Sequence, residues 1–274
     1  QATGFSRWSI DNVLIYEPRT WRLYMSKETW KIWDKDDSVE QRTYKRVTGE
    51  LPEMECTKQL VNLVSDEYLP GMSVLDVGCA AGHYYNGLKK IDAEIKYHGF
   101  DATKAYIDFA TKHFEGNKNT NFQVADIFEL PKNYTQYFDI VFCANVILHL
   151  PSMEIPLQNL LGMTRKHLFI RTLISDKTHL SRLLYSDSYD EHGETTDFVY
   201  QNTYSYDYVK KIINDFGNYK VEFIDDIFDS SQINKEHKAY DAVQSAVTRV
   251  ENGVQIAGSK VFEWQWIKIT LGSE

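Results

Sequence analysis

Short apolar runs alternate with amphipathic segments over the part of the chain that follows residue 71. Five of these runs have the length and composition of buried strands: Ser73–Val77, Lys96–Phe100, Phe122–Ala125, Phe138–Ala144 and His167–Leu173. Between the second and the third, apolar side chains repeat at helical spacing from Tyr106 to Phe114, and Thr103 before them is a typical N-cap residue. Strands that alternate with helices predict a parallel sheet with helices packed on it.

The chain before this alternation has a different pattern. Apolar residues recur at helical spacing from Leu60 to Tyr68 and are followed by a breaker at Leu69–Gly71. We therefore predict an N-terminal helical cap segment over residues 1–70 and an α/β domain over residues 71–274.

Three features follow the fifth strand. Residues 176–205 are dense in Tyr, Asp, Ser and His, and they form a candidate lid or substrate wall inserted into the domain. A helix pattern over Val209–Phe216 comes next. Two further strand patterns, Tyr219–Phe228 and Val261–Leu271, lie on either side of a helical pattern at Tyr240–Arg249. These closing strands predict an antiparallel pair at one edge of the sheet, joined by a long connection.

Composition narrows the class of protein. Of the 274 residues, 43% are hydrophobic and 25% are charged, which favours a folded chain over a disordered one. The formal net charge is −9, so the summed field repels a phosphate backbone and nucleic acid is disfavoured as the main partner. No apolar run approaches the roughly 20 residues that a membrane span needs, so we predict a soluble protein.

Cysteine usage and the first residues bear on the compartment. Cys56, Cys79 and Cys143 are odd in number and contain no C-x-x-C pair, which favours reduced thiols over a disulfide framework or a zinc site. The first residues lack both an initiator Met and the apolar core of a secretory signal, so the chain reads as trimmed at its start. We expect a cytoplasmic protein with no bound metal.

A glycine-containing turn follows the first predicted strand, in the run VLDVGCAAGHYYNGL of residues 74–88. Such a turn can bring backbone N–H groups to the polar end of a nucleotide, although a tight strand-to-helix corner is the alternative. NAD is a poor fit because His83 stands where the dinucleotide fingerprint requires a small residue. The spacing instead resembles the glycine loop of class I S-adenosylmethionine-dependent methyltransferases. The matching positions are Asp76, Gly78, Ala80 and Gly82, with Ala in place of the family's middle Gly.

Three further matches to this family follow in the family's order. The second strand ends in Asp101, where related enzymes place a carboxylate that accepts the ribose hydroxyls of the cofactor. The third strand ends in Asp126 and Ile127, the family's positions for the adenine amino group and the adenine ring. The fourth strand ends near Ala144, the family's position for a backbone carbonyl beside the methionine moiety. For each Asp taken alone, a helix N-cap is the alternative.

The resemblance covers about residues 71–175 by motif, and it extends to residue 271 by strand order. It implies a Rossmann-like, doubly wound sheet of seven mostly parallel strands whose last strand is antiparallel. It also implies S-adenosylmethionine as the cofactor and S-adenosylhomocysteine as its product. Related enzymes often bring an Arg to the cofactor carboxylate from the segment before the glycine loop, and Arg46 is the candidate here. The alternative is a solvated Arg46 paired with Glu50 or Glu53.

His149 is the candidate catalytic residue. By family analogy it lies near the transferred methyl group, and an imidazole titrates near neutrality, so it is suited to take the proton of a hydroxyl acceptor. The alternative is a histidine that holds its own loop by hydrogen bonding. We interpret His83 and His98 as structural side chains.

A helical cover and a long insertion would close the cofactor cleft from above, which favours a small acceptor over a folded protein or an RNA. We therefore predict methyl transfer from S-adenosylmethionine to an oxygen or a nitrogen of a small metabolite, such as a sugar or a polar natural-product or polysaccharide intermediate. The rival hypotheses are a non-catalytic cofactor-binding or regulatory protein and a protein or RNA methyltransferase.

Overall fold

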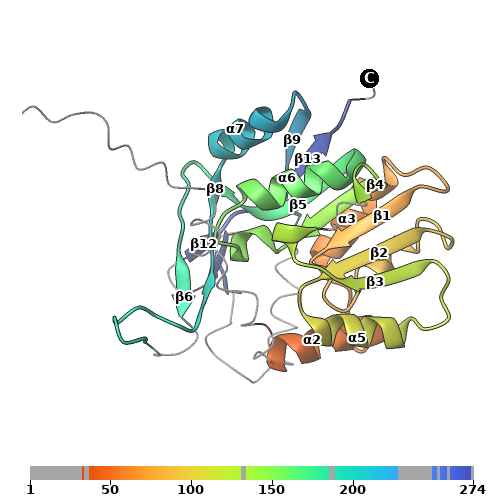
Figure 1. Ribbon diagram of the computed structural model, residues 1–274, viewed down its shortest axis with the longest axis horizontal. Coiled ribbons are helices and arrows are strands. Elements are labelled where there is room, and N and C mark those ends of the chain that lie inside the picture. The colour runs from red at the N-terminus through yellow and green to blue at the C-terminus, as the bar shows by residue number, and fades with distance from the viewer. Residues whose placement is uncertain are drawn as a thin grey trace, which may run out of the picture.

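The computed structural model describes residue 33 and residues 37–130, 134–184, 189–227, 249–251, 254–257 and 260–272. At its centre is a mixed sheet (Figure 1), in the order β3-β2-β1-β4-β5-β13-β9. The strand bounds are β1 Ser73–Val77, β2 Lys96–Asp101, β3 Thr120–Val124, β4 Phe138–Ala144, β5 Thr164–Ser175, β9 Lys220–Asp225 and β13 Trp264–Thr270. The two-residue strand β8 (Tyr204–Ser205) pairs with β5 outside this path.

Strand direction confirms the predicted fold class. Neighbouring strands from β3 to β5 are parallel. Strand β13 is antiparallel to both β5 and β9, so the last strand is inserted beside the edge strand. The path holds the seven predicted strands, and β8 makes an eighth because the chain returns to β5 after residues 176–203, pairing Tyr204 with Ile174 in parallel.

Helices cover both faces of the sheet (Figure 1). Helix α3 lies on one face with the short helix α4, while α6 and α7 lie on the other, and α5 contacts β2 and β3. The helix bounds are α2 Asp37–Thr48, α3 Glu55–Ser65, α4 Tyr85–Leu88, α5 Lys104–His113, α6 Glu154–Met163 and α7 Tyr206–Phe216. Two 3-10 turns follow strand ends, η2 Ile127–Glu129 and η4 Ile147–His149.

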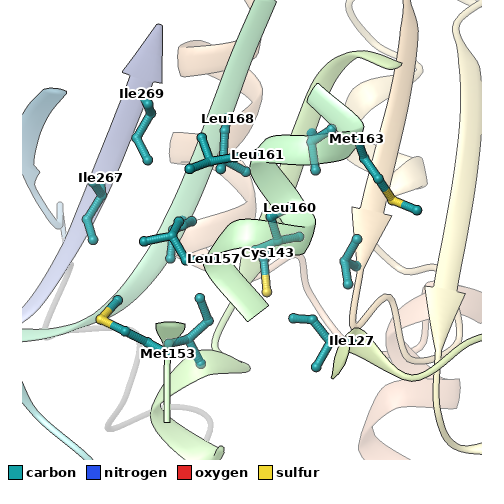
Figure 2. Close-up of a cluster of buried hydrophobic side chains, with 14 of the residues drawn as sticks. Ile127, Cys143, Met153, Leu157, Leu160, Leu161, Met163, Leu168, Ile267 and Ile269 are labelled. Atoms are coloured by element: carbon teal, nitrogen blue, oxygen red, sulfur yellow. The ribbon is translucent and has the colours of Figure 1, made fainter. Parts of the chain in front are cut away.

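Strand β4 shows why helices are needed on both faces of the sheet. All seven of its residues are buried, and successive side chains point to opposite faces. Ile140 and Phe142 belong to the hydrophobic cluster on the α3 face. Cys143 belongs to the cluster on the other face, where Leu157 and Leu160 of α6 cover the sheet (Figure 2). A strand buried on both faces reads as a continuous apolar run, which is how it could be recognised in the sequence.

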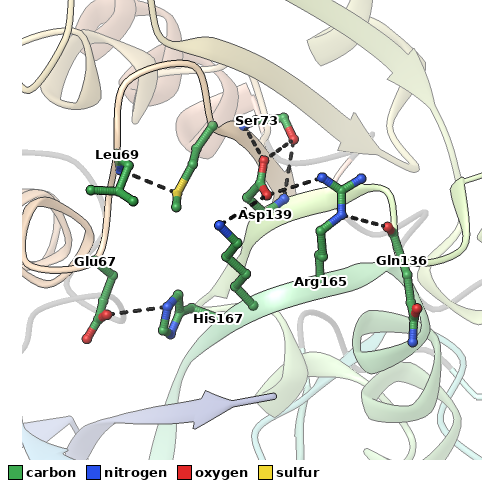
Figure 3. Close-up of polar contacts among 9 residues, drawn as sticks. Glu67, Leu69, Ser73, Gln136, Asp139, Arg165 and His167 are labelled. Atoms are coloured by element: carbon green, nitrogen blue, oxygen red, sulfur yellow. Dashed lines mark hydrogen bonds and ion pairs between the residues drawn. The ribbon is translucent and has the colours of Figure 1, made fainter. Parts of the chain in front are cut away.

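A polar network closes the amino end of the sheet (Figure 3). The carboxylate of Asp139, at the start of β4, accepts hydrogen bonds from the backbone N–H of Ser73 at 3.0 Å and from Arg165 at 3.2 Å. Nearby, His167 lies 3.3 Å from a carboxylate oxygen of Glu67. These groups connect the first residues of β1, β4 and β5. The opposite end of the sheet, where the parallel strands end, does not contain this network.

The C-terminal strands differ in part from the predicted pattern. The pattern at Val261–Leu271 is split at Glu263, whose carbonyl accepts the backbone N–H of Ile174. Residues before the split form β12 (Lys260–Phe262), which joins β10 (Arg249–Glu251) and β11 (Val254–Ala257) in a separate small sheet. The helical pattern predicted at Tyr240–Arg249 lies outside the described residues, except for Arg249, which begins β10.

Other expectations meet the structure only in part. Helices α2 and α3 lie within the predicted N-terminal helical segment, whose first 32 residues fall outside the described part of the chain. Residues 176–205 contain a two-stranded ribbon of β6 (Arg182–Leu184) and β7 (Phe198–Tyr200). The boundary at residue 70 and the lid role of the insertion stay predictions. All three cysteines are free and buried. Among the described helices, none combines the length and the apolar composition that crossing a bilayer requires.

The turn between β1 and α4 depends on residues that tolerate a left-handed backbone. Gly78 and Gly82 both have φ 81°, and Ala80 between them has φ 46°. A Cβ at Gly82 would lie 2.6 Å from the ring of Phe122, and one at Gly78 would lie 2.2 Å from Val146. The turn therefore packs directly against the residues that follow β4 and against β3, and this contact fixes its position over the end of the sheet.

Alanine at Gly82 tests this packing. A left-handed φ costs an L residue about 1–2 kcal/mol, and overpacking against Phe122 adds about 1–3 kcal/mol. We expect Gly82→Ala to lower the free energy of unfolding in chemical denaturation by about 2–5 kcal/mol. Gly116→Ala is the matched control, because Gly116 has φ 82° with open space around it. Equal losses in the two variants would contradict the packing role.

Candidate functional site

A cavity of about 340 Å³ lies where β1, β2, β3 and β4 end. Eight residues that the sequence singled out line it, although they come from widely separated parts of the chain. They are Arg46, Gly78, Ala80, Asp101, Asp126, Ile127, Ala144 and His149. The carboxyl edge of a doubly wound sheet is the usual place for a ligand in this fold class.

Asp101, the last residue of β2, is held by two backbone donors. One carboxylate oxygen accepts the N–H of Ala80 at 2.8 Å, and the other accepts the N–H of Thr103 at 2.8 Å. The left-handed backbone of Ala80 belongs to the turn that presents this N–H. The two bonds fix the carboxylate in one orientation at the cavity wall. Such a group suits a pair of hydroxyls.

Asp126 has the N-cap role that the sequence offered as the alternative, and it also faces the cavity. It is the N-cap of η2, where its side chain accepts the backbone N–H of Phe128 at 2.9 Å, and it also lines the cavity. Ile127 beside it is buried and lines the same wall. This wall therefore offers a fixed acceptor next to an apolar surface, which is the combination that a flat heteroaromatic ring with an amino group requires.

The end of β4 is fixed by a buried arginine that we did not predict. Asn145, which follows Ala144, has φ 62° and donates its backbone N–H to the carbonyl of Arg171 on β5. The guanidinium of Arg171 in turn donates to the side-chain oxygen of Asn145 and forms two bonds of 2.7 Å to Asp226. It also lies 4.1 Å from the ring of Trp264. Asn145 lines the cavity, so this network sets the shape of the wall.

His149 also lines the cavity, and it belongs to the 3-10 turn η4. Its Nδ1 lies 2.7 Å from the backbone carbonyl of Tyr200 in β7. Because a carbonyl only accepts, this contact requires the proton on Nδ1 and leaves Nε2 as the acceptor nitrogen. The ring of Trp33 meets it edge to face at 5.2 Å between centroids. The hydrogen bond joins the η4 turn to β7, and the catalytic role of His149 stays a prediction.

Arg46 reaches the cavity from the last turn of α2. The two carboxylates that the sequence offered as its alternative partners have other contacts. Glu53 pairs with Lys90 at 2.8 Å, and Glu50 accepts a hydrogen bond from the hydroxyl of Thr48. Arg46 thus lines the cavity, and its contact with the cofactor carboxylate stays a prediction.

Two predicted cofactor contacts do not line the cavity. Asp76 is buried beneath the glycine turn, where it accepts a 2.6 Å hydrogen bond from the hydroxyl of Tyr97. Burial raises the pKa of Asp76 well above its usual range, although the Tyr97 bond acts in the opposite sense, and the charge of Asp101 raises it further. Gly82 packs against Phe122. The cofactor contacts of both residues stay predictions.

The functional residues that we did not predict interact with partners that are far away in the sequence. Arg171 is a charged residue inside an apolar strand pattern, and this break in the pattern was the available signal. Asn145, Asp226 and Trp33 carried no such signal, because nothing in a single sequence pairs them with Arg171 or with His149.

Comparison with protein families gives one match. Residues 69–217 match a family model described as a methyltransferase domain. Among curated proteins, the ubiquinone biosynthesis O-methyltransferase of Coxiella burnetii is 37% identical over 92 residues, which is 33% of this chain and 38% of that protein. Phosphoethanolamine N-methyltransferase 3 of Arabidopsis thaliana is 34% identical over 116 residues, or 39% of this chain and 22% of that protein. The chain thus spans well under half the length of the curated relatives it matches.

Solved structures share the fold. The magnesium protoporphyrin IX methyltransferase of Synechocystis PCC 6803, with bound S-adenosylhomocysteine, superposes with a TM-score of 0.53 at 14% identity, covering 89% of this chain and 99% of that one. The [4+2]-cyclase SpnF superposes with a TM-score of 0.50 at 13% identity, covering 78% and 80%. Identities this low show the fold alone, and a cyclase has this fold as well. The predicted class I fold is confirmed.

The orientation of Asp101 leads to a binding prediction. Asp101→Asn keeps the size of the side chain but removes its charge and turns one acceptor into a donor that faces a backbone N–H. We expect the affinity for S-adenosylhomocysteine in calorimetry to fall by about 2 kcal/mol, or roughly thirtyfold. Asp108→Asn is the control, since Asp108 is an exposed side chain on α5 paired with Lys104. Unchanged affinity in Asp101→Asn would remove this residue from the site.

Proposed function

The chain belongs to the methyltransferase domain family and has the class I fold of S-adenosylmethionine-dependent methyltransferases, and on that premise we propose that it transfers a methyl group to an oxygen or a nitrogen of a small molecule. The observation that carries the proposal is the gathering of eight separated sequence positions at one cavity.

The residues at the cavity fit S-adenosylmethionine. Gly78 provides a backbone surface where a Cβ would collide with Val146, so the turn presents main chain instead of side chains at that point. The fixed carboxylate of Asp101 suits the ribose hydroxyls, and Asp126 with Ile127 suits the adenine. When bound, the cofactor supplies a methyl group that is already activated by its sulfonium.

The protein's own task is then to place the acceptor and exclude water. Ala144 and Asn145 form the wall beyond the glycine turn, and the bonds from Arg171 hold that wall rigid. For a hydroxyl acceptor, Nε2 of His149 takes the proton while Nδ1 stays bonded to the carbonyl of Tyr200. A neutral amine acceptor attacks directly and releases its proton afterwards, so it needs this base less.

A small acceptor is supported by three observations. The cavity is of ordinary ligand size and is partly covered by Trp33 and α2, which leaves little room for a folded partner. The formal net charge of −9 disfavours RNA. The relatives are named for ubiquinone biosynthesis and for phosphoethanolamine, both of which concern small molecules. These relatives include an O- and an N-methyltransferase, so the acceptor atom stays open between the two.

The destination of the methyl group tests the proposed class. We expect purified protein, incubated with methyl-labelled S-adenosylmethionine and a cell lysate, to place label in the small-molecule fraction. A reaction without the protein is the control for background transfer. Label confined to protein or RNA would replace the proposal with macromolecular methylation. Cofactor binding without any transfer would replace it with a non-catalytic binding role.

His149 is tested separately from cofactor binding. We expect His149→Ala to lower kcat for a hydroxyl acceptor by about a hundredfold or more, because proton removal is lost, while the affinity for S-adenosylhomocysteine changes little. His113→Ala, at the exposed end of α5, is the matched control. An unchanged kcat in the His149 variant would contradict its role as the base.

A further inference from the structure

We infer that His83 binds the carboxylate of the cofactor's amino-acid portion, beside Arg46. This inference rests on the proposed function, since it assigns a contact to the same ligand. It also replaces our interpretation of His83 as a purely structural side chain.

The ring nitrogens of His83 are the first observation. Both Nδ1 and Nε2 are shielded from solvent, and neither has a hydrogen-bond partner among the residues that the structure describes. A buried polar group without a partner costs about 1–3 kcal/mol, and native structures rarely leave one in this state without a reason. His83 also lines the cavity, so a ligand there is in reach of the ring.

The order of the strands is the second observation. Across the sheet, β3, β2 and β1 are neighbours. Asp126 follows β3, Asp101 is the last residue of β2, and the glycine turn follows β1. A ligand whose adenine lies over β3 and whose ribose lies over β2 therefore places its remaining portion over β1. His83 follows the glycine turn after β1, and it is at this end of the cavity.

The charges around His83 are the third observation. Arg46 lines the same cavity and, with His83, also lines a second hollow of about 230 Å³ that contains Glu53 and Lys90. Glu53 and Lys90 are paired with each other at 2.8 Å. The positive charge of Arg46 is close enough to act on the ring of His83. An anionic group is the ligand that this end of the cavity favours.

The protonation state defines how His83 takes part. Burial, followed by the positive charge of Arg46, lowers the pKa of His83 to about 3. The ring is thus neutral at pH 7 and carries one N–H donor. In the arrangement we propose, this N–H donates to a carboxylate oxygen while Arg46 supplies the charge.

Two ligands separate a direct contact from a structural effect. S-Adenosylhomocysteine has the carboxylate, whereas methylthioadenosine has the nucleoside and the thioether but no amino-acid portion. We expect His83→Phe, which keeps a ring beside Tyr84, to weaken S-adenosylhomocysteine binding in calorimetry at least about tenfold. Its affinity for methylthioadenosine should stay within about twofold. His83→Asn, which keeps a donor, should recover part of the loss.

A second histidine variant is the control for a general effect of replacing a histidine ring by phenylalanine. His98→Phe alters another partly buried ring, one that packs on Phe138 and does not line the cavity, and it should leave both affinities unchanged. Equal weakening of both ligands by His83→Phe, or no weakening of either, would overturn the contact. If neither ligand binds the wild-type protein, the proposed function itself fails, which is a different result from the failure of this inference.

Discussion

The site depends first on the carboxylate of Asp101, which joins the turn after β1 to the turn after β2. Its two oxygens accept the N–H groups of Ala80 and Thr103, so one side chain fixes both loops at the end of the sheet. The glycine turn completes this arrangement, because Gly78 packs closely on Val146 and Gly82 on Phe122, where no larger side chain fits without a shift. A charged group held by fixed dipoles is oriented before any ligand arrives, which lowers the ordering that binding requires.

A second constraint acts at the end of β4. Arg171 is buried and bonded to Asp226 by two hydrogen bonds, with Trp264 over its guanidinium. Removing one partner of such a buried pair costs about 3–5 kcal/mol, so the arginine is not free to leave Asn145. The C-terminal part of the chain, which carries Asp226 and Trp264, therefore helps to shape a cavity whose other walls come from the first half of the sheet.

Much of the fold could be predicted because its signals are local. The runs at residues 73–77 and 138–144 are mostly apolar, each with a single Asp, and they match β1 and β4 residue for residue. The glycines and the strand-end aspartates could also be predicted, because turns and helix caps favour particular residue types directly after a strand. Prediction failed where a role depends on distant partners. The Arg171–Asp226 pair joins residues far apart in sequence, and the strand at residue 260 belongs to another sheet. Asp76 matches the motif but is not among the residues that line the cavity, so its contact with the cofactor stays a prediction.

A crystal structure of the protein with S-adenosylhomocysteine tests the central claim most directly. The account predicts the ribose hydroxyls on the Asp101 carboxylate and the adenine against Ile127. It is contradicted if the ligand lies in another part of the molecule, or if it occupies this cavity with its ribose away from Asp101.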